Sequence, residues 1–178
     1  SGGRSGYALS FSSGDTDYVS IANQPVIGNI NAFSISFWIK TSSAGPTAKI
    51  YSEGSTASNN QLIAVSLDED VVGDIQFAVR DDANVVGSTS ATLNLADGNW
   101  HHVVAIQSSK SAREPYVDNV SRGTNDTTVG TLTMNRANIA RFERVSAQNY
   151  YQGFLDQVRI YNRAITGAEV TILYNAGK

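Results

Sequence analysis

The sequence predicts an all-β protein, a two-sheet antiparallel sandwich with one short helix near its C-terminal end. Stretches such as residues 33–40 alternate apolar and polar side chains with the period of a strand that has one face in a core. Charged residues make up only 16% of the chain, and many of the remaining polar residues are Ser, Thr, Asn and Gly, which is typical of strands joined by polar turns. Only the last dozen residues show a helical pattern.

The length and charge of the chain limit its class and its partners. The 178 residues fit one domain, 1–178, in which we expect residues 1–5 to be a linker or a cloning remnant. The net charge of −3 comes from scattered acids, and the sequence has no basic stripe that would bind nucleic acid. It also has no apolar run of about 18 residues, so membrane insertion is not expected. There are no cysteines and therefore no disulfides. We expect a piece of a longer secreted or cell-surface protein.

The predicted strands follow one another along the whole chain. Residues 33–40 are the clearest, with Phe33, Ile35, Phe37 and Ile39 inward and Trp38 on the opposite face. Residues 55–60 are small and polar and are predicted to be a surface loop. The other predicted strands are residues 7–11, 17–21, 48–52, 61–67, 74–80, 89–95, 100–106, 139–142 and 153–161.

The last of these strands carries an acid in an unexpected place. With a strict strand period, Asp156 shares one face with three apolar residues, Phe154, Val158 and Ile160. A carboxylate among apolar neighbours needs compensation by backbone donors, by an arginine or by a metal ion. After the strand, Thr166 and Glu169 have the spacing of a capping box, which predicts the start of the helix.

Two segments resemble a known family. The run from Gly153 to Glu169 and the segment Trp100-His101-His102-Val103 are similar to the laminin-G-like and pentraxin-type domains of the concanavalin A-like lectin and glucanase superfamily. The resemblance implies that the closing strand completes a two-sheet jelly roll. It implies little about the ligand, because the family includes lectins, adhesins, carbohydrate-binding modules and enzymes.

A structural calcium ion is expected at the meeting point of the first and last strands. Asp17 and Asp156 would converge there, and the resemblance implies calcium near the acid of the closing strand. The family loop often begins with Phe-Asp-Gly, but Ser12 stands at the acidic position, so Asp15 and the Gly54 carbonyl are the further predicted ligands. The alternative is that Asp156 accepts backbone N–H groups or pairs with an arginine.

No motif indicates an enzyme. The sequence lacks the common nucleophile, zinc and nucleotide signatures, and it lacks the alternating acids of glycosidases with this fold. The acidic segment 68–73 departs from a calcium loop and is predicted to be a turn. Of the two histidines, His102 is expected to be structural and His101 points the other way.

The candidate ligand-binding residues are aromatic rings and polar side chains that suit a sugar. Rings pack on the C–H faces of sugars, while amides and guanidinium groups meet the hydroxyls. The alternative for the rings is structural, with Trp38 covered by a loop and the paired tyrosines sealing a sheet edge. The candidates are Trp38, Tyr150, Tyr151, Asn149, Asn59 and Arg80, with support from Asn60 and Gln76.

These observations favour a non-catalytic, lectin-like carbohydrate-binding module that recognises a polysaccharide or glycan and belongs to a larger extracellular protein. The second hypothesis is an adhesion or protein-interaction module of a surface or phage protein. A hydrolase or lyase of this fold is the weakest of the three. An aromatic platform beside a groove would favour the first hypothesis, and a broad flat apolar patch the second.

Overall fold

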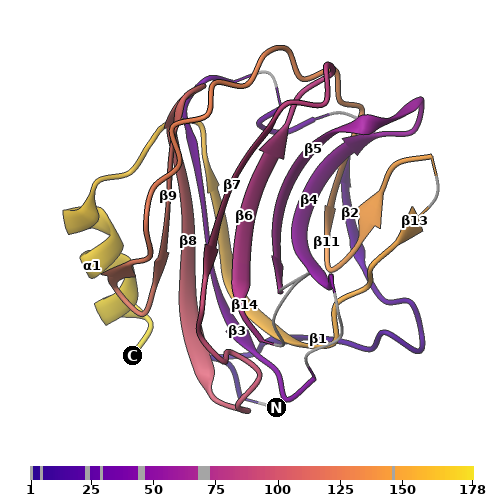
Figure 1. Cartoon of the computed structure of the whole chain (residues 1–178). Helices are drawn as coiled ribbons and strands as arrows, with labels where there is room; N and C mark the ends of the chain where they lie inside the picture. The colour runs from indigo at the N-terminus through magenta and orange to yellow at the C-terminus, as the bar shows by residue number, and fades with distance from the viewer. Residues whose placement is uncertain are drawn as a thin grey trace.

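The computed structural model describes residues 2–4, 6–22, 25–28, 30–43, 47–67, 73–145 and 147–178. Within these residues the chain forms two antiparallel six-stranded sheets, with one helix on the outer side of the first sheet (Figure 1). The predicted two-sheet sandwich with a short C-terminal helix is confirmed. The predicted turn at residues 68–73 falls mostly outside the described residues.

Neighbours in each sheet come from distant parts of the sequence. In spatial order the first sheet consists of β1 (Leu9–Phe11), β14 (Gly153–Tyr161), β3 (Phe33–Lys40), β8 (Trp100–Ser109), β9 (Ala112–Val117) and β10 (Val120–Ser121). The second sheet consists of β2 (Val19–Ala22), β11 (Arg136–Ile139), β4 (Lys49–Ser55), β5 (Ser58–Leu67), β6 (Ile75–Arg80) and β7 (Val86–Ala91). A small separate hairpin pairs β12 (Phe142–Glu143) with β13 (Ala147–Gln148).

The core lies between the two sheets, where the alternating apolar residues of both meet. The four inward residues predicted in β3 are completely buried, and the rings of Phe33 and Phe77 meet edge to face at 6.2 Å. Each apolar side chain of this size contributes roughly 1.5–3 kcal/mol when it is fully buried. The strict alternation along β3 and β6 therefore holds the sheets together and turns their polar residues outward.

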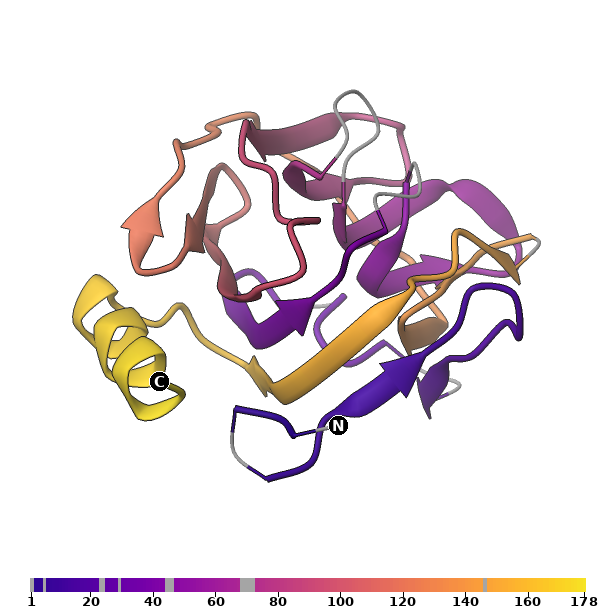
Figure 2. The ribbon, with the colours of Figure 1, turned by 90° about the horizontal axis from the view of Figure 1, so that it is seen from below.

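The helix α1 (Gly167–Ala176) packs on the outer face of the first sheet, as the view in Figure 2 shows from below. It begins with the predicted capping box, in which Glu169 N–H donates to Thr166 Oγ1 at 3.3 Å and Thr166 N–H donates to Glu169 Oε2 at 2.8 Å. Val170 anchors the helix in a second apolar cluster with residues of β8. No helix in the described part of the chain is long and apolar enough to cross a bilayer.

Three predicted boundaries were wrong. Residues 55–60 are not a loop, because β4 and β5 form a hairpin that pairs Ser55 with Ser58. The strand predicted at residues 89–95 corresponds to β7, which begins and ends earlier, at Val86 and Ala91. The strand predicted at 139–142 is divided, since Ala140 adopts a φ of 64° between β11 and β12. The sequence did not predict this hairpin because its small polar residues have low β-propensity and show no alternation of apolar and polar side chains.

A β-bulge in β14 changes the predicted faces of the closing strand. Asp156 pairs with Trp38 and Arg159 with Ser36, so β14 holds one extra residue there, and Gln157 adopts a φ of 51°. The extra residue reverses the alternation. Leu155 is buried in the core before the bulge, whereas Val158 and Ile160 pack on the core after it. Asp156 therefore lies on the outer side of the first sheet, where it is only 9% exposed, which corrects the prediction that it shares a face with Val158 and Ile160.

Candidate functional site

A groove of about 430 Å³ crosses the outer face of the second sheet. Strands β5, β6 and β7 form its floor, and the β12–β13 hairpin, which lies on the outer side of this sheet in Figure 1, forms a wall. We call it the sheet-face groove. Its lining residues are Thr47, Lys49, Leu62, Gln76, Ala78, Arg80, Val86, Ser88, Phe142, Arg144, Gln148 and Asn149.

The alternation of β6 explains why the floor is polar. Its inward residues are the core residues Ile75, Phe77 and Val79, so the residues between them must face outward. Gln76 and Arg80 therefore extend into the groove from one strand. The same pattern that builds the core thus places hydrogen-bond donors on the open face.

Two arginines from distant segments converge at one end of the groove. Arg80 Nη2 donates to the backbone carbonyl of Asn59 at 2.6 Å, and its Nε donates to the carbonyl of Asn60. Arg144 Nη1 donates to the same Asn59 carbonyl at 3.2 Å, and its guanidinium lies 5.0 Å from the ring centre of Phe142. The backbone of β5 and one aromatic ring therefore fix both guanidinium groups.

The other end of the groove is built by Asn149 and Lys49. The Asn149 side chain donates to Thr47 Oγ1, and its carbonyl accepts the N–H of Lys49 at 2.9 Å. Lys49 is nearly buried, and its ammonium donates to Ser66 Oγ at 3.3 Å. These contacts place a lysine ammonium on the floor and an asparagine at the rim.

The structure brings several of the predicted ligand-binding residues together. Arg80 and Asn149 line the sheet-face groove, as does the supporting residue Gln76. Asn59 contributes the carbonyl that both arginines share. Tyr150 is partly exposed and does not line this groove.

Two predicted aromatic residues offer no ring to a ligand, which corrects their assignment. Trp38 is only 2% exposed, because α1 covers it and Tyr174 stacks on it at 5.7 Å. Arg4 lies over the same indole at 4.6 Å. Tyr151 is completely buried, and its ring meets Phe11 edge to face at 6.4 Å. The period of the strand correctly placed Trp38 on the outer face of the first sheet. It could not show that α1, from the other end of the chain, covers this residue.

The four predicted calcium ligands do not come together. Asp156 faces outward from the first sheet, whereas Gly54 lies in the second sheet and its carbonyl accepts the N–H of Asn135 at 3.0 Å. Asp17 accepts the N–H of Ser12 at 3.0 Å, in the exposed loop that also holds Asp15. Among the described residues no group of three or more His, Asp or Glu side chains could hold a metal ion. The predicted set therefore does not fit one ion.

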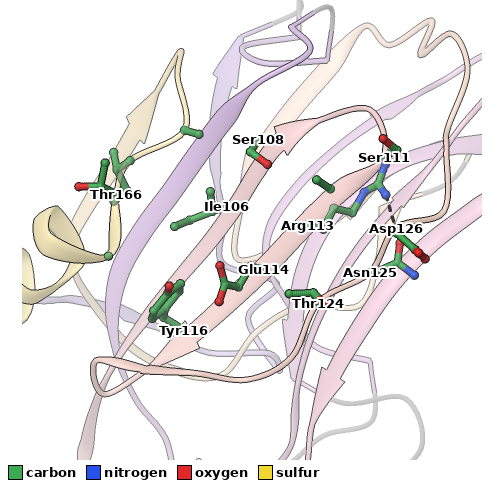
Figure 3. A pocket seen from close by; sticks show the side chains of 14 residues that line it. Ile106, Ser108, Ser111, Arg113, Glu114, Tyr116, Thr124, Asn125, Asp126 and Thr166 are labelled. Carbon is green, nitrogen blue, oxygen red and sulfur yellow. Dashed lines mark hydrogen bonds between the residues drawn. The ribbon is translucent and has the colours of Figure 1, made fainter.

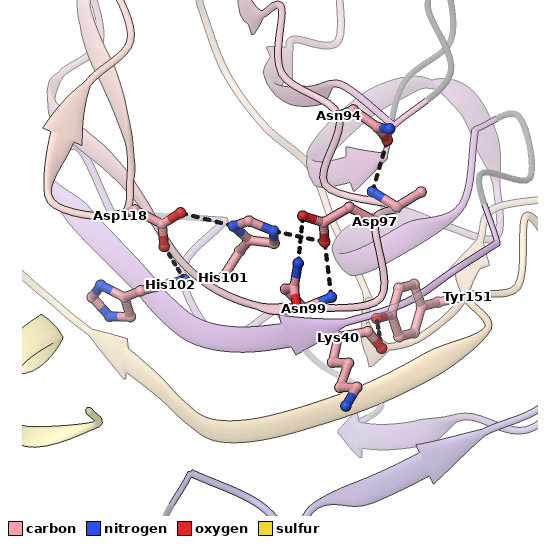
Figure 4. Close-up of polar contacts among 9 residues, drawn as sticks. Lys40, Asn94, Asp97, Asn99, His101, His102, Asp118 and Tyr151 are labelled. Atoms are coloured by element: carbon pink, nitrogen blue, oxygen red, sulfur yellow. Dashed lines mark hydrogen bonds and ion pairs between the residues drawn. The ribbon is translucent and has the colours of Figure 1, made fainter.

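His101 bridges two carboxylates where β8 begins (Figure 4). Its Nδ1 lies 2.7 Å from Asp118 Oδ2, and its Nε2 lies 3.1 Å from Asp97 Oδ1. The hydrogen bond to Asp118, with a smaller effect of Asp97, raises the pKa of His101. Asp118 and Asn119 form the turn after β9, and their φ values of 51° and 67° are typical of a type I′ hairpin. The cluster therefore connects the loop before β8, which holds Asp97, to the turn after β9, which holds Asp118.

His102 points to the opposite face of β8 and is completely buried. Its Nε2 lies 3.0 Å from Ser36 Oγ, and burial lowers its pKa to about 4. The hydrogen bond to Ser36 is within the first sheet, in agreement with the structural role that the sequence predicts.

A second groove, of about 460 Å³, lies on the outer face of the first sheet beside the start of α1 (Figure 3). We call it the helix-side groove and define it by Ile106, Arg113, Glu114, Tyr116 and Asp126. The Arg113 guanidinium donates to two backbone carbonyls at 2.7 Å each. Because Arg113 is only 1% exposed, the charged side chains that can meet a ligand in this groove are two acids, Glu114 and Asp126.

Sequence reasoning missed five polar residues of the sheet-face groove, and the ones with long side chains are Lys49, Arg144 and Gln148. Lys49 is at the start of a predicted strand, and the other two lie in a polar stretch that seemed to be an ordinary loop. The available signal was the density of polar residues in 143–149 just before the closing strand. This density of polar residues indicates a binding groove only once the β12–β13 hairpin is known to lie over the second sheet.

Comparison with known proteins identifies related folds. A family model of the laminin G type, described as the concanavalin A-like lectin/glucanases superfamily, matches residues 13–171. No curated protein sequence matches the chain.

Three solved structures illustrate the likeness. The IT-sialidase CBM40 of Ruminococcus gnavus, bound to α2,3-sialyllactose, has a TM-score of 0.77 at 10% identity over 94% of this chain and 96% of that one. Domain 4 of an extracellular arabinanase from Geobacillus stearothermophilus, in complex with arabinotriose, has a TM-score of 0.74 at 16% identity over 98% and 79%. A heptameric SAP-like pentraxin from Limulus polyphemus has a TM-score of 0.63 at 16% identity over 82% and 70%. At these identities the likeness shows a common fold.

Proposed function

Because the chain belongs to the concanavalin A-like lectin/glucanase superfamily, we propose that it is a non-catalytic carbohydrate-binding module and that the sheet-face groove holds the sugar. One observation carries this proposal. Gln76, Arg80 and Asn149 line one groove of about 430 Å³, a size common for ligand sites. Their N–H groups are suitable donors to sugar hydroxyls.

Apolar side chains between these donors suit the other surface of a sugar. Leu62 and Val86 line the groove beside the polar residues of β6. A pyranose presents hydroxyls at its edge and C–H groups on its faces, so an alternation of donors and apolar groups complements it.

The absence of carboxylates from the described lining of the groove supports binding without cleavage. Glycoside hydrolysis needs two carboxyl groups, about 5 Å apart in retaining enzymes and about 6.5–9.5 Å apart in inverting ones. The arginines and amides here can orient a sugar, but they cannot supply both the acid and the base.

The names of two structural neighbours support the same reading. One is a CBM40 with sialyllactose and the other an arabinanase domain with arabinotriose, so both hold saccharides and both are parts of enzymes. By analogy we propose that this module is attached to other domains of an extracellular protein.

A pair of matched variants tests the site. Ser88→Trp places an indole in the sheet-face groove, and Ser108→Trp places one in the helix-side groove, each from an outward strand position. A glycan array should first identify a ligand for the unmodified protein. We expect Ser88→Trp to abolish its binding and Ser108→Trp to leave it unchanged, with both variants melting like the parent.

The opposite pattern would move the site to the helix-side groove. Silence of the whole array would contradict carbohydrate binding and favour the adhesion hypothesis. Calcium binding stays a prediction without an assigned site. An ion at 100 times its dissociation constant adds about 2.7 kcal/mol to the free energy of unfolding, so an equal melting temperature in calcium and in EDTA contradicts it.

A further inference from the structure

The sheet-face groove has a one-sided charge. Two partly exposed arginines line it, Arg80 and Arg144, and its described lining includes no acidic side chain. The helix-side groove has the opposite character, since Glu114 and Asp126 line it and its arginine, Arg113, is only 1% exposed. The two outer faces of the sandwich therefore differ in the charge of ligand that they suit.

The two arginines of the sheet-face groove are held close to each other. Arg80 Nη2 and Arg144 Nη1 donate to the same Asn59 carbonyl oxygen, so these nitrogens lie within about 6 Å of each other, a distance at which like charges repel. Both positions are fixed by backbone from β5, so neither group needs to be ordered when a ligand arrives. An anion between them would lower the repulsion.

A carboxylate is the anion that matches this arrangement in a saccharide. The guanidinium group is planar and pairs with the two oxygens of a carboxylate, and such charge-assisted hydrogen bonds are stronger than neutral ones.

We propose that the sheet-face groove selects saccharides that carry a carboxylate, with Arg144 and Arg80 as the groups that recognise it. This inference rests on the proposed function, because it names the class of sugar for the same site. Arg144 and Arg80 determine specificity, while Gln76 and Asn149 meet hydroxyls that acidic and neutral sugars share.

Matched pairs of ligands separate this inference from the proposed function. The probes are polygalacturonate and sialyllactose, each compared with its own methyl ester, so each pair differs only in the charge of its carboxylate and the two pairs distinguish a uronic from a sialic acid. Calorimetry should give at least about tenfold tighter binding for one acidic member than for its neutral partner, the effect of one charge-assisted contact. Raising NaCl from about 0.05 to about 0.5 M should weaken that binding.

Variants at one position show which residue causes the preference. We expect Arg144→Gln to lower the affinity for the acidic ligand about tenfold and Arg144→Lys to restore only part of it, because lysine keeps the charge but loses the planar pair of donors. Lys110→Gln removes a positive charge from an exposed position elsewhere and should have no effect. Melting temperatures verify that each variant is folded.

Two outcomes overturn the inference in different ways. Equal or better binding of the neutral partners, or an Arg144→Gln variant that keeps the preference, contradicts acid selection and leaves carbohydrate binding in place. Failure of every probe, together with a silent glycan array, contradicts the proposed function as well.

Discussion

The ring of Tyr174 stacks on the indole of Trp38 with the ring centres 5.7 Å apart and the planes 11° from parallel. This contact joins α1 to β3 and covers the part of the outer face of the first sheet around Trp38. The sheet-face groove lies on the other side of the sandwich. The helix therefore leaves the groove open while it covers the ring that the sequence suggested for ligand binding.

Tyr174→Ala should loosen the helix and expose the indole. Aromatic pairs contribute about 0.5–1.5 kcal/mol beyond their buried area, so we expect a loss of about 1–2 kcal/mol in the free energy of unfolding. Tryptophan fluorescence should shift to the red before global unfolding. Tyr174→Phe keeps the stacked ring and serves as the control. An unshifted spectrum for the alanine variant would contradict the covering role of α1.

The buried carboxylate of Glu53 should be more important for stability than any surface acid. It is completely buried and accepts the N–H groups of Val26, Ile27 and Gly28 at 2.8 Å and the Tyr51 hydroxyl at 2.6 Å. In Glu53→Gln an amide N–H₂ must face one of these donors, so chemical denaturation should show a loss of about 1–3 kcal/mol.

The control for this variant is Asp126→Asn, at an exposed acid, which should change the stability by less than about 0.5 kcal/mol. Equal stability of the glutamine variant and the parent protein would show that the segment at residues 25–28 does not depend on the carboxylate.

His101 should make stability depend on pH above pH 6.5. Its folded pKa is raised from the model-compound value of 6.5 by Asp118 and Asp97, so its contribution is complete below 6.5 and is lost as the pH rises through the folded pKa. The melting temperature of the parent protein minus that of His101→Gln should therefore be largest at about pH 6 and should shrink toward pH 9.

The burial of His102 gives the opposite dependence below pH 6.5, but His102 is present in both proteins and its effect cancels in the difference. A difference in melting temperature that stays constant with pH would contradict the pair of contacts made by the His101 imidazole.

The bulge in β14 predicts an unusual effect of glycine. Gln157 adopts a φ of 51°, a region that costs a non-glycine residue roughly 1–2 kcal/mol. After the larger backbone entropy that glycine loses on folding, Gln157→Gly should still stabilise the protein by about 0.5 kcal/mol. Gln157→Val, with a β-branched side chain, should destabilise it. Thermal melts measure both, and a glycine variant that melts lower than the valine variant would contradict the assigned backbone.

Much of the fold could be predicted because local patterns determine it. The alternation of residues 33–40 and 74–80 gave the inward faces correctly, and Thr166 with Glu169 gave the start of the helix. Neither prediction needs knowledge of distant residues. The resemblance of the closing strand to laminin-G-like domains then gave the family that the comparison confirms.

What only the tertiary structure decided is which side chains are exposed and which ones meet. One extra residue at Gln157 put Val158 and Ile160 on the core side while Asp156 stayed on the outer side, and a helix more than 120 positions away covered Trp38. Arg80 and Arg144 come from strands and hairpins far apart in the chain and meet at one carbonyl of β5. Periodicity describes each strand alone, so it cannot predict a bulge, a covering helix or a pair formed across the sheet.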